Sequence, residues 1–208
     1  MSRHCTPRNM QTLLVVEDDA DFNRHLSQFM MTEGYCVYSA HDRQEALAIN
    51  PQPMLALLDM GLPPAKNHIS EGLFLIDALL ATEPRSKIIV ITGHDENQAA
   101  FEAVRHGAFD FLKKPASISE IKSAIKRAAL FLRHETSLTA FGETRLHLTV
   151  KLSDGPQECA DTVEEQIVRH TLSDTNGNVS EAARRLGLVR ENLYYYLKKY
   201  GIQPNRAK

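Results

Sequence analysis

The sequence predicts an α/β fold, a doubly wound five-stranded parallel sheet, followed by a small all-α domain built around a helix-turn-helix. Short apolar runs alternate with segments of helical periodicity from residue 12 to about residue 133, which is typical of a parallel sheet with crossover helices. Two of these runs end on carboxylates, at the edge where open sheets bind their ligands. Near the C-terminus, two helical segments flank a short turn that contains glycine, which is typical of a helix-turn-helix.

Five pairs of strand and helix can be counted in the first part of the chain. The apolar runs expected to be strands are 12–16, 36–40, 54–58, 87–92 and 109–113. The segments expected to be helices are 20–33, 43–49, 70–82, 96–106 and 119–132. Gly34, Pro84 and Gly107 fall where helices should end, and Ser117 to Glu120 has the sequence of a capping box at the last helix.

We expect a first domain over residues 11–133, a linker over 134–160 and a second domain over 161–208. The linker contains the alternating apolar residues Leu146, Leu148, Val150 and Leu152, and this period of two predicts one short strand. A partly ordered linker explains the pattern equally well. In the second domain, helices are expected over 161–173, 179–186 and 190–200.

The composition is that of an ordinary globular protein, with 43% apolar and 24% charged residues. No apolar stretch approaches the roughly 20 residues of a membrane span, and the residues up to Gln11 lack the apolar core of a secretion signal. We therefore expect a cytoplasmic protein without a membrane partner. The three cysteines, Cys5, Cys36 and Cys159, are scattered and form no CxxC pair, so we expect them to be reduced.

Positive charge is concentrated at the end of the chain. The net charge of the whole chain is −2, whereas the residues from Thr175 onward contain seven Lys or Arg against two Glu. A small basic segment on an otherwise acidic chain fits nucleic-acid binding, although a solvated helical face gives a similar count.

Carboxylates end two of the predicted strands: Glu17 and Asp18 follow the first, and Asp59 follows the third. Because the C-terminal ends of parallel strands lie at one edge of the sheet, the three acids should meet in one crevice. Their hard oxygen ligands suit Mg²⁺, which binds one or two carboxylates together with a phosphate. For a lone acid here, capping of the following helix by Asp18 or Asp19 is the simpler explanation, but Thr92 and Lys114 at two further strand ends favour a site for phosphoryl transfer.

Several motifs stand in the order found in receiver domains of two-component response regulators. They are Val15-Val16-Glu17-Asp18, Leu57-Leu58-Asp59, Ile89-Val90-Ile91-Thr92-Gly93 and Phe109-Asp110-Phe111-Leu112-Lys113-Lys114-Pro115. Residues 12 to about 132 therefore resemble a receiver domain, which has a flavodoxin-like fold. The resemblance implies that a sensor histidine kinase phosphorylates the carboxylate of Asp59.

The resemblance also implies a role for the other residues of the site. The expected Mg²⁺ ligands are Glu17, Asp18, Asp59 and the backbone carbonyl of Gly61. Lys114 would place a positive charge beside the phosphoryl group, and Thr92 would hydrogen-bond to it. Phe111 would rotate into the space that Thr92 vacates and so remodel the surface of the fourth helix and fifth strand. A core aromatic is the simpler reading of Phe111, but its position three residues before Lys114 favours the switch.

Two features depart from the receiver pattern. The glycine that usually stands eight residues after the phosphoacceptor is here Gly72, so residues 64–71 contain an insertion of about five residues. This insertion either gates the access of phosphate or water or is a neutral surface loop. Gly61 and His94 occupy the two variable positions beside the phosphoryl group, which leaves the lifetime of the phosphorylated state open.

The segment from Gly177 to Gly201 resembles the Fis-type helix-turn-helix of NtrC-type regulators, because Asn-Val-Ser-Glu-Ala-Ala-Arg-Arg-Leu-Gly nearly matches the usual sequence of that family. The residues expected to face DNA are Arg190, Asn192, Tyr194, Tyr195, Lys198 and Lys199. Arg can read guanine and Asn adenine, whereas the lysines suit phosphates. The tyrosines replace the usual basic residues, so we expect weaker nonspecific binding and a shallower salt dependence. They also suit the shielding of the helix or a protein partner.

Together these features predict a response regulator that binds double-stranded DNA as a homodimer, paired through the helix over 161–173, and that responds to phosphorylation of Asp59. We expect no enzyme activity beyond its own phosphotransfer and dephosphorylation. No GxxxxGK[ST] loop occurs, and the layout resembles the short RegA/ActR-like regulators. Two alternatives stay open: a phosphorylation-independent dimeric transcription factor, and an adaptor whose tyrosine-rich helix binds a protein. The kinase, the signal, the operator and the sign of regulation are not predictable.

Overall fold

The chain folds into two compact units, Met1–Arg133 and His134–Lys208. They are seen in a computed structural model that describes residues 11–65, 68–93, 96–146 and 149–203. Each unit has its own hydrophobic core, and each is described by itself below.

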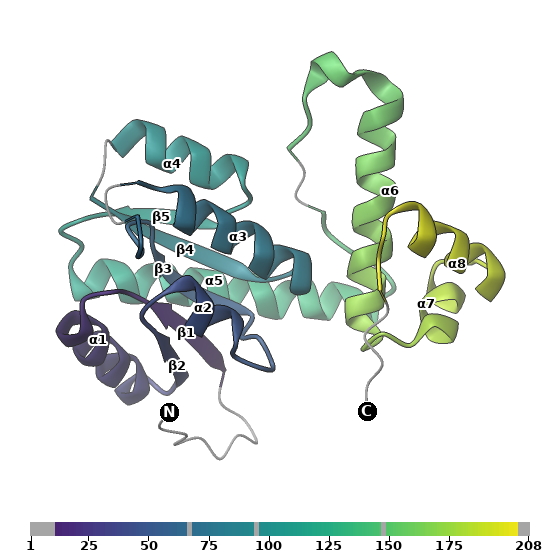
Figure 1. Ribbon diagram of the computed structural model, residues 1–208. Helices are drawn as coiled ribbons and strands as arrows, with labels where there is room; N and C mark the ends of the chain where they lie inside the picture. Colours follow the sequence, from purple (N-terminus) through teal and green to yellow (C-terminus); the bar gives the residue numbers. More distant parts are fainter. Residues whose placement is uncertain (1–10, 66–67, 94–95, 147–148, 204–208) are drawn as a thin grey trace. The chain divides into compact units, whose positions relative to one another are not determined.

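The first unit is built on a five-stranded parallel sheet, as predicted (Figure 1). Its strands are β1 (Thr12–Val16), β2 (Cys36–Ala40), β3 (Leu55–Asp59), β4 (Lys87–Thr92) and β5 (Asp110–Lys113). Their order in the sheet is β2-β1-β3-β4-β5. Val16 is in register with Leu58 and Asp59 with Ile91, so the C-terminal ends of β1, β3 and β4 lie along one edge. This edge positions the candidate site.

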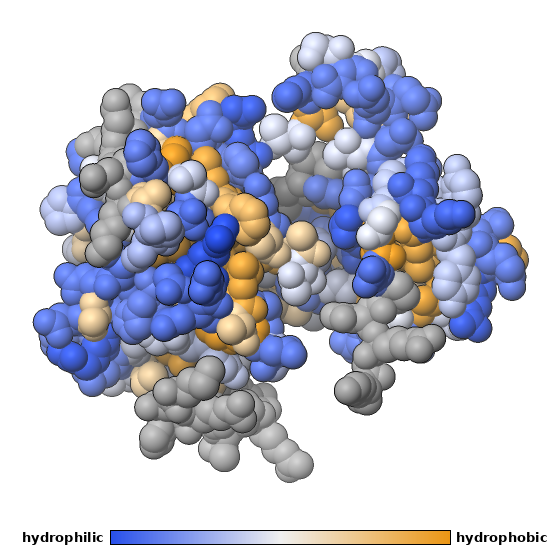
Figure 2. Space-filling model, viewed as in Figure 1, coloured by the Kyte–Doolittle hydropathy of each residue, from blue (hydrophilic) through white to orange (hydrophobic). Residues whose placement is uncertain are grey.

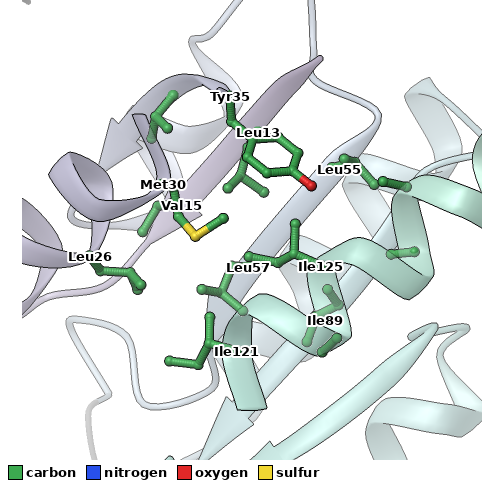
Figure 3. Close-up of a cluster of buried hydrophobic side chains, with 14 of the residues drawn as sticks. Leu13, Val15, Leu26, Met30, Tyr35, Leu55, Leu57, Ile89, Ile121 and Ile125 are labelled. Carbon is green, nitrogen blue, oxygen red and sulfur yellow. The ribbon is translucent and has the colours of Figure 1, made fainter. Parts of the chain in front are cut away.

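Helices cover both faces of the sheet (Figure 1). They are α1 (Ala20–Thr32), α2 (Arg43–Leu47), α3 (Ser70–Thr82), α4 (Glu96–Arg105) and α5 (Ile118–Ala140). Because side chains alternate across a strand, β1 directs Leu13 and Val15 towards α1 and α5, as Figure 3 shows. Leu14 and Val16 pack on the other face with residues of α2, α3 and α4.

Most predicted element bounds agree with the structure to within two residues, and α5 is the main exception in this unit. It continues to Ala140, eight residues beyond the predicted end. Residues 133–140 contain neither Gly nor Pro, and the first residue that breaks the helix is Gly142, which has a positive φ of 76°. The predicted capping box is confirmed, because Ser117 N–H donates to Glu120 Oε2 at 2.8 Å and Glu120 N–H donates to Ser117 Oγ at 3.2 Å.

The expectation that all three cysteines are reduced is wrong for Cys36. This residue is buried at the start of β2 and is disulfide-bonded, whereas Cys159 is a free thiol. Cys5 lies outside the described residues. The spacing rules for cysteine could not find this bond, because they recognise zinc ligands and disulfide frameworks rather than single bridges.

The second unit is helical. It contains a short 3₁₀ helix, η1 (Leu152–Asp154), and the helices α6 (Gly155–Asp174), α7 (Val179–Arg185) and α8 (Arg190–Lys199). The predicted strand over 146–152 is not formed in its described part, because residues 149–151 are irregular and Leu152 begins η1. Residues 147 and 148 lie outside the described part of the chain.

Helix α6 begins six residues before the predicted start at Asp161. Pro156 lies in its first turn, where a proline is tolerated because the backbone N–H has no helical partner. The core of this unit contains Val168, Leu172, Ala182, Leu193 and Leu197, and so joins all three helices.

The turn between α6 and α7 is set by local chemistry. Asn176 and Gly177 both have positive φ values, 50° and 76°, a conformation that Gly and Asn adopt most readily. Asn178 then caps α7, because its side chain accepts a hydrogen bond from Glu181 N–H at 3.1 Å. Gly187, with a positive φ of 66°, lies in the turn that leads from α7 to α8, and the two helices pack together in one core, so they form the predicted helix-turn-helix.

Polar residues cover most of the visible face of each unit, and apolar residues form small patches between them (Figure 2). Within the described part of the chain, no helix combines the length and the apolar character that crossing a membrane requires.

Candidate phosphoryl-transfer site and DNA-binding helix

Three carboxylates meet at the C-terminal edge of the sheet. Glu17 directly follows β1 and Asp59 is the last residue of β3, and both residues are buried, with 4% and 8% of their surface exposed. Asp18 completes the group, in which one oxygen of each acid lies within 4.8 Å of the others. Among the described residues, no other group of His, Cys, Asp or Glu meets this criterion. The structure thus brings together the three acids that the sequence singled out.

Lys114 lies between two of these acids. Its Nζ is 2.8 Å from Asp59 Oδ2 and 3.0 Å from Glu17 Oε2. The residue follows β5, and its backbone N–H donates to the carbonyl of Thr92 at 2.8 Å, which fixes it beside the end of β4. Burial alone would lower the pKa of the Lys114 ammonium, but its bonds to Asp59 and Glu17 outweigh burial and raise the pKa. The lysine therefore carries a positive charge in the site.

The environment of Glu17 disfavours its charged form. Burial is the largest effect, followed by repulsion from Asp59, and together they raise the pKa of Glu17 although Lys114 acts in the opposite direction. A second cation in this crevice would relieve the repulsion among the acids. The donor set of three carboxylates consists of hard oxygen ligands, which fit Mg²⁺.

The loop after β3 is fixed close to Asp59 despite its insertion. The backbone N–H of Met60 donates to Ile91 O at 3.2 Å, and that of Gly61 donates to Asp59 Oδ1 at 3.2 Å. Gly72 in α3 lies against this loop so closely that an added Cβ would be 2.9 Å from Met60 Cα. The loop therefore keeps its packing near the acid. Residues 66 and 67 lie outside the described residues.

The two residues expected to form a switch differ in exposure. Thr92 ends β4, one residue after Ile91, the register partner of Asp59, and its side chain is buried. Phe111 in β5 is 46% exposed, so its ring faces solvent rather than the core. This exposure removes the simpler reading of Phe111 as a core aromatic. His94 lies outside the described residues.

One buried polar residue beside the acids was not found from the sequence. Asn23 in α1 donates hydrogen bonds from its Nδ2 to the carbonyls of Glu17 and Ala40, both at 2.9 Å. The signal for it is a polar residue on the helix face that also carries Leu26 and Met30. Such a residue needs a partner inside the fold, but the partner cannot be named from periodicity.

Helix α8 presents aromatic and basic side chains on its exposed face. Arg190 Nη2 donates to the Tyr194 hydroxyl at 3.1 Å, and the guanidinium carbon is 5.5 Å from the centre of the same ring. Tyr195 is 64% exposed, and Asn192 and Lys198 are exposed as well. The predicted base-reading residues therefore stand on one accessible helix, with Arg190 held against Tyr194.

Lys199 has a different position from the other predicted DNA-facing residues. Its Nζ lies 2.9 Å from Asp161 Oδ1 and 2.9 Å from Glu164 Oε2, both on α6. The hydroxyl of Tyr200 donates a short hydrogen bond to Glu164 as well. These bonds raise the pKa of the Lys199 ammonium, with the contact to Tyr200 as the largest cause, and they lower the pKa of Glu164. We call these four residues, Asp161, Glu164, Lys199 and Tyr200, the α6–α8 clamp.

Two further arginines near the turn are also engaged by an acid. Arg184 and Arg185 in α7 both pair with Glu181, at 2.6 and 3.1 Å, and these bonds lower the pKa of Glu181 to about 2. Part of the positive charge that the sequence shows near the C-terminus is therefore balanced within the unit. On α8, Arg190 and Lys198 are exposed, whereas the ammonium of Lys199 is paired with Asp161 and Glu164.

The family comparisons match both units. Residues 13–126 match the response regulator receiver domain, and residues 160–200 match the bacterial regulatory protein Fis family. The chain therefore belongs to the two-component response regulators, and its domains indicate a transcription factor rather than a metabolic enzyme.

Similar proteins share the whole layout. The chain is 30% identical to the photosynthetic apparatus regulatory protein RegA of Cereibacter sphaeroides over 193 residues, which cover 91% of each chain. It is also 30% identical to the acid tolerance regulatory protein ActR of Rhizobium meliloti over 91% of this chain and 87% of ActR. A crystal structure of a response regulator from Burkholderia pseudomallei, with a phosphorylated aspartic acid, a calcium ion and citrate, is 27% identical. The match covers 88% of this chain and 96% of the Burkholderia pseudomallei chain, with a TM-score of 0.50.

Proposed function

We propose that a sensor histidine kinase phosphorylates Asp59 and that this modification controls how the second unit binds double-stranded DNA. The observation that carries the proposal is the meeting of Glu17, Asp18 and Asp59 with Lys114 at one edge of the sheet. The Burkholderia pseudomallei regulator supports it, because that protein was crystallised with a phosphorylated aspartic acid and a calcium ion.

Phosphoryl transfer at this site is a substitution at phosphorus. A carboxylate oxygen of Asp59 forms a bond to the phosphorus of a phosphohistidine, the P–N bond breaks, and the electron pair returns to the imidazole of the kinase. Lys114 stabilises the negative charge on the transferred oxygens, because its ammonium already lies 2.8 Å from Asp59. Glu17, Asp18, Asp59 and the Gly61 carbonyl would hold Mg²⁺, which neutralises charge on the phosphoryl group.

The phosphoryl group would be sensed at the neighbouring strand end. Thr92 is buried there, whereas Phe111 is exposed. When the Thr92 hydroxyl moves to the phosphoryl oxygens, the ring of Phe111 can rotate inward and bury part of its surface. The chemical step thus changes the surface of α4 and β5. We propose that this change alters a homodimer of the chain, because helix-turn-helix proteins bind two half-sites as a two-fold symmetric pair.

The DNA-contacting residues follow from their accessibility on α8. We assign Arg190 and Asn192 to base edges, Tyr194 and Tyr195 to thymine methyl groups and phosphates, and Lys198 to phosphates. Lys199 is already bonded to two acids of α6, so it contributes less to DNA binding than its charge indicates. Because the proposed switch acts on DNA, we propose that the protein is located in the cytoplasm.

The test is DNA binding to duplexes selected from random sequence, with and without Mg²⁺ and beryllofluoride, a phosphoryl mimic. We expect selection of a two-fold symmetric site whose affinity changes at least fivefold with beryllofluoride, and we expect Asp59→Asn to abolish this response. The same site without a response would identify a phosphorylation-independent transcription factor. The absence of a selected site would favour an adaptor that binds protein through Tyr194 and Tyr195.

A further inference from the structure

The buried amide of Asn23 uses its complete hydrogen-bonding capacity beside the acidic site. The residue is 0% exposed. Its Nδ2 donates to the carbonyls of Glu17 and Ala40 at 2.9 Å each. Its Oδ1 accepts from the hydroxyls of Ser27 at 3.2 Å and Ser39 at 2.5 Å. Two donated and two accepted bonds are all that one amide group can make, so this polar group is fully satisfied without water.

These bonds fix the backbone of Glu17 on both sides. Its N–H donates to the carbonyl of Ala40 at 3.1 Å, while its own carbonyl accepts from Asn23 and lies 3.2 Å from His41 Nδ1. The first residue after β1 is therefore joined to the end of β2 and to α1 together. A carboxylate that binds a small cation needs such support, because Mg²⁺ demands near-ideal geometry from its ligands.

The backbone that follows Glu17 is also fixed, by its contacts with the first turn of α1. Asp19 caps α1, since its Oδ1 accepts from the backbone N–H groups of Asp21 at 2.9 Å and Phe22 at 3.0 Å. Asn23 begins the next turn, and its N–H donates to Asp19 O at 2.8 Å. Asp18, the third acid of the group, thus lies between two residues whose positions are set by α1.

We propose that Asn23 is a positioning residue of the Mg²⁺ site: its two donated hydrogen bonds hold Glu17 and Asp18 where they can share a cation with Asp59. The inference rests on the proposed phosphoryl-transfer function and adds a residue that does not itself touch the metal or the phosphoryl group. Outer residues that orient metal ligands typically change metal affinity by about 10- to 100-fold when they are removed.

The experiment is a Mg²⁺ titration of the full chain by isothermal calorimetry, combined with thermal unfolding in the absence of Mg²⁺. We expect Asn23→Ala to weaken Mg²⁺ binding at least tenfold, the lower end of the range for such residues. The matched controls are Ser27→Ala and Ser39→Ala, which each remove one bond to Oδ1 and leave the two donated bonds in place. We expect the controls to change the Mg²⁺ affinity less than about threefold.

A second variant separates positioning from stability. Asn23→Asp keeps the size and the acceptor oxygens for the two serines, but it cannot donate to the carbonyls of Glu17 and Ala40. Its added negative charge would by itself strengthen the binding of a cation, so weaker Mg²⁺ binding by this variant isolates the lost donation. We expect it to bind Mg²⁺ more weakly than the natural chain.

The outcomes distinguish the role of Asn23 from the proposed phosphoryl-transfer function on which it rests. If the natural chain binds Mg²⁺ and both Asn23 variants bind it equally well while they unfold at lower temperature, Asn23 is only structural and the inference is overturned. The same holds if Ser27→Ala and Ser39→Ala weaken the affinity as much as Asn23→Ala. If the natural chain itself binds no Mg²⁺, the proposed function fails and the inference fails with it.

Discussion

Each unit of the chain places a lysine between two carboxylates at nearly the same distances. Lys114 lies 2.8 and 3.0 Å from Asp59 and Glu17, and Lys199 lies 2.9 Å from each of its two acids on α6. The surroundings differ, because the side chains of Asp59 and Glu17 are 9% and 5% exposed, whereas those of Asp161 and Glu164 are 40% and 41% exposed.

This difference separates a chemical site from a structural contact. Burial, followed by repulsion from Asp59, raises the pKa of Glu17, because little water screens the two buried acids. They therefore gain from a further cation or a transferred phosphoryl group that Lys114 can stabilise. The acids of the α6–α8 clamp are screened by solvent, and Glu164 already accepts a hydrogen bond from the Tyr200 hydroxyl. In the clamp, one ammonium and two carboxylates therefore serve to hold α6 and α8 together.

The largest predicted contrast comes from the same Asp→Asn substitution beside each of the two lysines. Asp59→Asn removes the nucleophile and should abolish the incorporation of phosphate from a small phosphodonor such as acetyl phosphate. Asp161→Asn removes one exposed charge, and because exposed ion pairs contribute about 0–1 kcal/mol, we expect DNA affinity to change less than about fivefold. Phosphate incorporation and a binding titration measure the two effects. A comparable loss of phosphorylation in both variants would contradict the distinction.

A second prediction concerns the packing behind the buried site. A Cβ at Gly72 would lie 2.8 Å from Met60 Sδ and 2.9 Å from Met60 Cα, so Gly72→Ala must displace the loop that follows Asp59. We expect a loss of about 1–3 kcal/mol in the free energy of unfolding and slower phosphorylation, measured by denaturant unfolding and by phosphate incorporation. Gly93→Ala is the control, because its nearest neighbour, Lys114 Cβ, is 3.6 Å away. Equal effects of both substitutions would argue against the loop contact.

The third prediction compares adjacent lysines on α8. If Lys198 contacts a phosphate, Lys198→Ala should reduce the slope of log K against log salt by about one. Lys199→Ala should lower the unfolding temperature of the second unit and leave this slope nearly unchanged, because its ammonium is bonded to α6. Binding titrations at several salt concentrations measure the slopes. A reduced slope for Lys199→Ala alone would reverse the two assignments.

The smallest predicted effect is the pH dependence of the α6–α8 clamp. The bond from Tyr200 and then that from Lys199 lower the pKa of Glu164, so its contribution is present above the ordinary glutamate value of 4.5 and is lost as the pH falls below it. We expect Glu164→Gln to lower the unfolding temperature by about 1–3 °C at pH 7, as for an exposed pair. The difference should shrink as the pH falls from 4.5 through the lowered pKa of Glu164. NMR signals of α8 followed during heating provide the measurement, and a difference that does not shrink with falling pH would rule out titration of Glu164.

Much of the first unit was predictable because its strands are buried on both faces and appear as continuous apolar runs. Glu17 and Asp59 could be placed together because parallel strands end at one edge. Asn23 was missed because three of its partners, Glu17, Ser39 and Ala40, lie directly after β1 and on β2, and no local pattern joins them to α1. The acids that bind Lys199 are 35 and 38 residues away in sequence, so the lysine was predicted from its charge and its place on the helix alone.

The α6–α8 clamp also distinguishes the two ends of α8. Its contacts involve Lys199 and Tyr200 at the C-terminal end of α8, whereas Arg190 lies at the other end, about 15 Å away along ten residues. The N-cap residue there is Val189, whose side chain has no polar group to cap the helix. The Arg190 end is instead held by Leu193, which is fully buried in the core of this unit. Loss of the clamp would therefore release the last turn of α8 and leave the turn that carries Arg190 packed in place.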